Sequence, residues 1–147
     1  MTHAEYYVGL DLGQKQSFTA IAVVERSLER EEVRNPIYYT LEWREMTEPR
    51  IAVRHLERIP LGTSYCDVVE RVRELVLHDA LRGRVKLVVD GTGPGVPVVD
   101  LLRRDKALMA GCELEAVTIT AGVRTVKGPR PGEWIVPTAR GCRRRRG

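Results

Sequence analysis

Residues 6–11 read Tyr-Tyr-Val-Gly-Leu-Asp, and residues 18–25 read Phe-Thr-Ala-Ile-Ala-Val-Val-Glu. Both runs are rich in the β-branched and aromatic residues that favour strands. The polar segment between them, residues 12–16, is short, so we expect the two strands to form an antiparallel hairpin. The first strand of this hairpin ends on an acidic residue, Asp11.

A second compact apolar run, Val85–Val89, leads directly into another acid, Asp90. Its length and composition predict a buried strand. The other elements that we expect are a charged turn over residues 25–34, a strand over 37–46, a short edge element over 55–59, a helix capped by Thr63 or Ser64, a helix that follows the turn 91–95 and ends near Gly111, and a strand over 114–120.

The expected order is therefore β-β-β-α-β-α-β, in one α/β domain over residues 1–137. Three antiparallel strands followed by β-α crossovers predict a mixed sheet that is covered by helices. Crossovers between parallel strands are right-handed in nearly all proteins, which leaves few topologies. In the simplest one, the strand that ends at Asp90 lies parallel to, and beside, the strand that ends at Asp11.

This placement suggests a metal site formed by Asp11 and Asp90. Open α/β sheets bind ligands beyond the carboxyl ends of their strands. Two carboxylates on strands about 4.8 Å apart repel each other unless a cation lies between them. Mg²⁺ takes oxygen ligands at about 2.0–2.1 Å and keeps waters for other partners. Two such ions, about 3.5–4 Å apart, can stabilise both oxygens of a phosphodiester cleavage.

Glycines follow each acid: Gly13 after Asp11, and Gly91, Gly93 and Gly95 after Asp90. Glycine removes side chains that would keep a phosphate backbone away from the carboxylates. The same glycines are equally typical of tight strand-to-helix turns. The segment 91–95 is not a phosphate-binding loop of the ATPase type, because no Lys-Ser or Lys-Thr follows it.

The composition of the 147 residues is that of a globular protein, with 43% apolar residues. No apolar run approaches the roughly 18 residues of a membrane span, and no secretory signal precedes residue 6. The three cysteines, Cys66, Cys112 and Cys142, are widely separated, which favours a reducing compartment over a disulfide framework. We therefore expect a cytoplasmic protein without a membrane partner.

The net charge of +4 comes entirely from the last residues of the chain. Without Arg143, Arg144, Arg145 and Arg146, basic and acidic residues balance. We expect residues 138–147 to be a disordered Arg-rich tail. Such a tail either binds polyanions through phosphate contacts or is simply solvated.

Several motifs resemble one family in the same order. The hairpin Tyr7–Glu25 resembles the opening of ribonuclease H-like nucleases, and most of all the nuclease domain of the phage terminase large subunit. Leu87–Leu102 resembles the second acidic motif of that domain, and Arg54–Thr63 and Val117–Gly122 fit its pattern as well. The resemblance covers residues 6 to 137.

The resemblance implies a ribonuclease H-like fold and a two-metal-ion endonuclease that cuts double-stranded DNA during phage packaging, together with other packaging proteins. Asp11 and Asp90 would be its first two catalytic ligands for Mg²⁺ or Mn²⁺. The candidate DNA contacts are Lys15, Gly91, Thr92, Gly93, Arg143, Arg144, Arg145 and Arg146.

The sequence departs from the family at its end, because no third acidic ligand follows Val136-Pro137. We expect a fold that is incomplete at the C-terminus, as in a truncated or prophage-derived form with weak or no activity. Losing about 3–4 kcal/mol of transition-state stabilisation slows a reaction by some 10²–10³-fold. Asp100 and Glu133 are the two candidates to replace the missing ligand.

Other functions remain open at this point. One is a noncatalytic nucleic-acid-binding module or a degenerate prophage remnant. Another is a fragment of an actin-like ATPase or sugar kinase, which shares the acidic hairpin and a later Gly-rich turn but needs a second domain. A Holliday-junction resolvase is similar in size, yet it also requires a late acidic pair.

Overall fold

The computed structural model describes residues 3–13, 16–45, 48–81 and 83–138. In chain order its elements are β1 (His3–Asp11), β2 (Thr19–Leu28), β3 (Arg30–Arg34), β4 (Leu41–Glu45), β5 (Arg50–Ile59), α1 (Tyr65–Val76), β6 (Val85–Asp90), α2 (Gly95–Arg104), α3 (Lys106–Gly111), β7 (Cys112–Thr120), β8 (Val126–Lys127) and β9 (Glu133–Pro137).

Seven of the strands form one mixed sheet, in the order β5-β2-β1-β6-β7-β9-β8. β2 runs antiparallel to β1, while β6 runs parallel to β1 and β7 runs parallel to β6. The α/β class, the first hairpin and the position of the Asp90 strand beside the Asp11 strand are therefore confirmed.

The third strand of the main sheet is β5, not the segment 37–46 that we expected. β5 pairs antiparallel with β2 along almost its whole length and forms one edge of the sheet. The edge element that we expected over residues 55–59 is therefore longer and begins at Arg50. Hydrophobic alternation indicates a strand only where one face is buried, and much of β5 has both faces in water.

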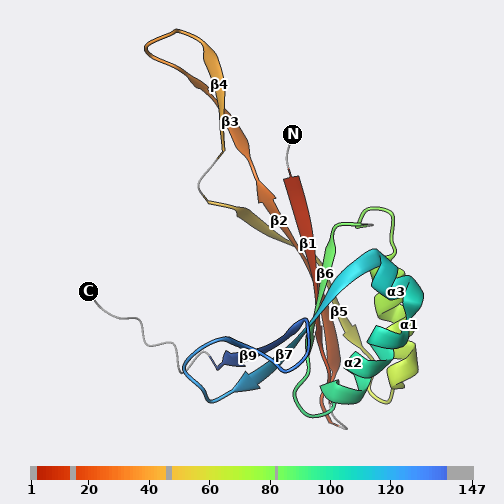
Figure 1. Ribbon diagram of the computed structural model, residues 1–147. Helices are drawn as coiled ribbons and strands as arrows, with labels where there is room; N and C mark the ends of the chain where they lie inside the picture. The colour runs from red at the N-terminus through yellow and green to blue at the C-terminus, as the bar shows by residue number, and fades with distance from the viewer. Residues whose placement is uncertain (1–2, 14–15, 46–47, 82, 139–147) are drawn as a thin grey trace.

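The expected turn over residues 25–34 is also wrong, because β2 continues to Leu28 and β3 follows it. β3 pairs with β4 in a separate two-stranded sheet that projects from the body of the protein (Figure 1). The apolar side chains of this hairpin are exposed: 73% for Tyr38, 74% for Tyr39 and 67% for Trp43. The apolar content of segment 37–46 thus does not mark a core strand.

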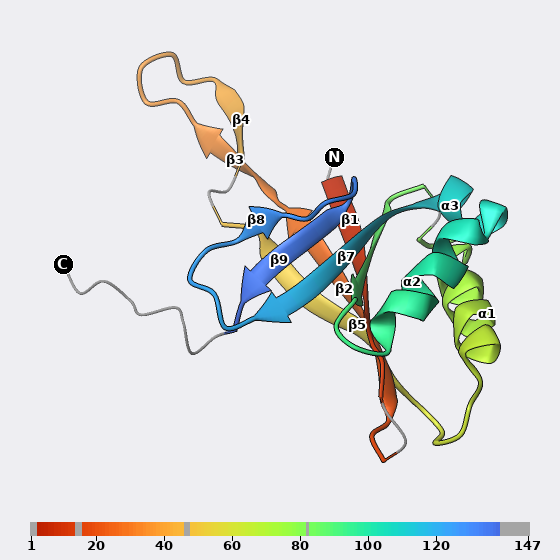
Figure 2. The ribbon, with the colours of Figure 1, turned by 60° about the horizontal axis from the view of Figure 1, so that its bottom comes forward.

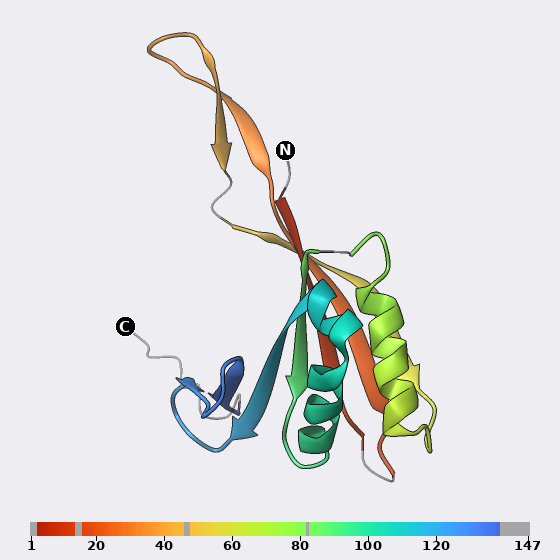
Figure 3. The same ribbon diagram turned by 45° about the vertical axis from the view of Figure 1, so that its right-hand side comes forward.

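The three helices lie on the same side of the main sheet (Figures 2 and 3). α1 begins where expected, because the side chain of Ser64 accepts a hydrogen bond from the amide of Asp67 at 3.2 Å. Arg71 on this helix donates to the carboxylate of Glu57 on β5 at 2.9–3.0 Å, which ties α1 to the edge strand.

The second expected helix is in fact two. α2 ends at Arg104, and Asp105 takes an extended conformation with φ −76° and ψ 99°. The carboxylate of Asp105 accepts a hydrogen bond from the amide of Leu108 at 3.0 Å, so it caps α3. The apolar period alone did not reveal this break, because apolar residues on both sides of it face the same core.

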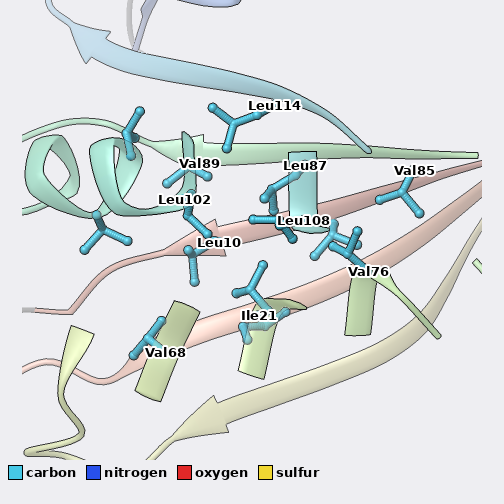
Figure 4. Close-up of a cluster of buried hydrophobic side chains, with 14 of the residues drawn as sticks. Leu10, Ile21, Val68, Val76, Val85, Leu87, Val89, Leu102, Leu108 and Leu114 are labelled. Carbon is cyan, nitrogen blue, oxygen red and sulfur yellow. The ribbon is translucent and has the colours of Figure 1, made fainter. Parts of the chain in front are cut away.

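The core lies between the helices and one face of the main sheet (Figure 4). Alternate residues of β1 and β6 point into it, as the strand period of two requires. Helical residues four apart, such as Val68 and Val72, meet them from the other side. The fully buried side chains with the largest volumes are Ile21, Leu87, Leu102, Leu108, Val8, Val68, Val72, Val76, Val89 and Val98.

The far edge of the sheet contains two strands that we did not expect. β9 runs parallel to β7, and the short β8 runs antiparallel to β9. β9 ends at Pro137, the residue at which we placed the end of the domain. The tail that we expected over residues 138–147 lies, beyond Thr138, outside the described residues.

Candidate metal centre

Asp11 and Asp90 occupy equivalent positions at the ends of two adjacent parallel strands. The register between β1 and β6 pairs Gly9 with Val88 and Leu10 with Val89. One further step in the same register places Asp11 opposite Asp90. Neighbouring strands are about 4.8 Å apart, so the two residues lie within the span of a shared cation.

Both acidic side chains point to the face of the sheet opposite the helices. Leu10 and Val89 are buried in the core, 2% and 0% exposed, and successive side chains of a strand alternate between faces. Asp11 is exposed and Asp90 is partly exposed. Among the described residues, no helix covers this second face, which we call the open face (Figures 1 and 3).

The two acids border a wide, shallow cavity of about 620 Å³ on the open face. Most of its floor is small or aliphatic, which leaves room for a large ligand to approach the carboxylates. The cavity is lined by Gly9, Leu10, Asp11, Ala20, Ile21, Ala22, Leu56, Glu57, Arg58, Val88, Asp90, Val117 and Ile119.

The turn after β6 holds the Asp90 carboxylate in place. The amide of Thr92 donates to Asp90 Oδ1 at 2.9 Å, and the Thr92 hydroxyl accepts a hydrogen bond from the amide of Ile119 at 3.1 Å. The amide of Gly91 donates to the carbonyl of Val117 at 2.8 Å. The turn is therefore attached to β7, and it fixes Asp90 without using Oδ2.

The carboxylate of Asp11 accepts no hydrogen bond from any described residue. Two adjacent carboxylates with so few internal partners repel each other, and a bound cation removes that repulsion. Their oxygens are hard donors, the type that Mg²⁺ and Mn²⁺ prefer. Asp11 and Asp90 thus suit one such ion.

Within the described part of the chain no third acid completes this pair, since Glu57, which also borders the cavity, accepts hydrogen bonds from Arg71 on α1. Among the described residues there is no group of three or more side chains that could hold a metal. Asp100 pairs with Arg130 at 3.4 Å and Glu133 pairs with Arg103 at 3.2 Å, both in a separate cavity between α2 and the β7–β9 edge. Neither acid substitutes for the missing ligand in this arrangement.

The expected DNA contacts are only partly placed. Gly91, Thr92 and Gly93 form the turn beside Asp90, and Gly93 has a positive φ of 60° that favours glycine. The amide of Thr92 donates to Asp90, and its hydroxyl accepts a hydrogen bond from Ile119 on β7. Lys15 and residues Arg143–Arg146 lie outside the described residues.

Sequence reasoning did not identify Arg58, which borders the same cavity. The local signal is that Arg58 is exposed and precedes the buried Ile59 on the same strand, so the two side chains point to opposite faces. The pairing of β5 with β2, which brings Arg58 to the site, cannot be seen in the local pattern.

No model of a known protein family matches the sequence, and no curated protein is significantly similar to it. Within the described residues, no helix combines the length and apolar character needed to cross a lipid bilayer.

Proposed function

We propose that this protein is a metal-dependent endonuclease domain of the ribonuclease H-like class, similar to the terminase nuclease. One observation carries the proposal: Asp11 and Asp90 end adjacent parallel strands and share the open face. The strand order β5-β2-β1-β6-β7, antiparallel and then parallel, supports the ribonuclease H-like assignment. Double-stranded DNA is the proposed substrate.

Asp11 and Asp90 would hold Mg²⁺ or Mn²⁺ through their carboxylate oxygens. A bound ion of this kind polarises a phosphoryl oxygen and lowers the pKa of a water nucleophile. The chain itself contributes position: β1 and β6 hold the two acids in register, and the amide of Thr92 orients Asp90. The small side chains of the cavity floor admit a nucleic-acid backbone.

The predicted rate is low, because the described residues supply two carboxylates rather than three. A missing anionic ligand removes about 3–4 kcal/mol of transition-state stabilisation, which corresponds to some 10²–10³-fold in rate. The same count favours one alternative, a module that binds nucleic acid without cleaving it. A degenerate remnant or an ATP-binding fragment would lack metal-dependent nicking as well.

Titration calorimetry with Mn²⁺ and a plasmid-nicking assay test the proposal. We expect the wild-type protein to bind Mn²⁺ and to nick supercoiled DNA slowly, and Asp11→Asn and Asp90→Asn to abolish both. Asp100→Asn is the matched control, since that acid lies in the other cavity and pairs with Arg130. It should retain Mn²⁺ binding.

Each other outcome selects a different function. DNA binding without nicking would identify the noncatalytic module, and ATP binding would identify the kinase-like class. Mn²⁺ binding that survives Asp11→Asn would refute the metal site. Rapid cleavage by the wild-type protein would refute the predicted low rate.

A further inference from the structure

Arg58 lies in the same row of the sheet as the two aspartates. Its partner across β2 is Ala20, and the partner of Ala20 across β1 is Asp11. The row continues with Asp90, beside Asp11 on β6, and with Val117, which pairs with Asp90 from β7. Residues that pair directly across neighbouring strands point to the same face of the sheet, so these side chains lie on the open face, where the residues border the cavity.

The guanidinium of Arg58 is held by an aromatic ring rather than by an acid. Its carbon lies 4.2 Å from the centroid of the Phe18 ring, a cation–π contact. Two other arginines of the same strand are neutralised: Arg50 pairs with Glu29 at 3.2 Å, and Arg54 pairs with Glu25 at 2.7 Å. Within the described part of the chain, Arg58 forms no ion pair with a carboxylate.

The space between Arg58 and Asp11 is open. The two residues are two strands apart, about 10 Å between their backbones, and only the methyl group of Ala20 lies between them. An arginine side chain can cover most of that distance. A ligand over Ala20 would therefore meet a fixed cation on one side and the acidic pair on the other.

We infer that Arg58 and Phe18 form a phosphate-binding site for the backbone of the bound DNA strand. The planar guanidinium presents a fork of N–H donors that matches two phosphate oxygens, and stacking on a ring pre-orders it. The inference deepens the proposed function, because it rests on the open face being the DNA-binding face. Arg58 is a substrate-binding residue in this arrangement, not a metal ligand.

The site predicts a specific salt dependence. Each phosphate contact that a protein makes contributes about 0.9 to the slope of log affinity against log salt for duplex DNA. Removing Arg58 should therefore reduce the magnitude of this slope by about 0.9, the contribution of one phosphate contact, and weaken binding by roughly tenfold. A side chain that only supports the fold would change affinity without changing the slope.

The test is fluorescence anisotropy with a labelled 20-base-pair duplex in Ca²⁺, measured at several salt concentrations for the full chain. We expect Arg58→Ala to reduce the slope, Arg58→Lys to restore it, and Phe18→Leu to weaken binding with the slope unchanged. Arg50→Ala, which removes a paired arginine from the same strand, should bind as the wild-type protein does.

The outcomes separate this inference from the proposed nuclease. Slow Mn²⁺-dependent nicking with no slope change in Arg58→Ala would overturn the phosphate site and leave the nuclease standing. A reduced slope in a protein that binds no Mn²⁺ would support the phosphate site and refute the metal centre. Equal slope losses in Arg58→Ala and Arg50→Ala, or no binding of DNA at all, would overturn the inference.

Discussion

The start of α2 packs directly against the end of β6, at Gly95. A Cβ atom added to Gly95 would lie 2.0 Å from the carbonyl oxygen of Asp90 and 2.9 Å from the carbonyl carbon. Carbon and oxygen atoms remain about 3.3 Å apart even in close favourable contacts. Gly95→Ala must therefore move the helix start, or Asp90 itself, by roughly an ångström.

The expected change in the free energy of unfolding of Gly95→Ala follows from two opposing effects. Forcing an extra methyl group into a packed site costs about 1–3 kcal/mol. Replacing glycine by alanine otherwise stabilises by about 0.4–1 kcal/mol, because the unfolded chain loses conformational freedom. We expect Gly95→Ala to lower the free energy of unfolding by about 1–2 kcal/mol. A displaced Asp90 should also weaken Mn²⁺ binding by at least about tenfold.

Urea denaturation and Mn²⁺ calorimetry measure the two effects. Gly91→Ala is the matched control for stability, since the nearest atoms to its added Cβ are 3.8 Å away, an ordinary contact distance. That variant should be as stable as the wild-type protein, or slightly more stable. Wild-type stability in Gly95→Ala, or an equal loss in Gly91→Ala, would refute the reasoning.

Three further predictions concern the rest of the fold. Ser64→Ala should lower the free energy of unfolding in urea by about 1 kcal/mol, because it removes the N-cap of α1, and an unchanged urea midpoint would contradict this. The pKa of Glu57 is lowered because hydrogen bonds from Arg71 stabilise its charged form. Its contribution to stability is therefore complete above the unfolded-state pKa and should be lost as the pH falls below about 4.3. Glu57→Gln should flatten this part of the stability–pH curve. An unchanged curve would exclude the Glu57 carboxylate as a source of this pH dependence. Burial raises the pKa of the Cys112 thiol to about 11, so iodoacetamide should modify this thiol far more slowly at pH 8 than it modifies the exposed Cys66. Equal modification rates at the two cysteines, measured by site-resolved mass spectrometry, would contradict this.

The sequence predicted the centre of the fold better than its edges. Segments with one buried face, such as β1, β6 and α1, carry a clear apolar period and were placed correctly. β3 and the first half of β5 have no buried face, so their pattern resembles that of a loop. The break between α2 and α3 was missed because a single capping residue, Asp105, interrupts an otherwise continuous apolar period.

The candidate site likewise has one part that the sequence predicted and another part that it did not. The sequence alone predicted that Asp11 and Asp90 end strands, because the apolar runs that lead into these acids are a local property of the chain. Only the tertiary structure decided that these strands are in register and that Arg58 lies in the same row. Register between segments tens of residues apart depends on how the whole sheet packs against its helices, and no local pattern encodes that packing.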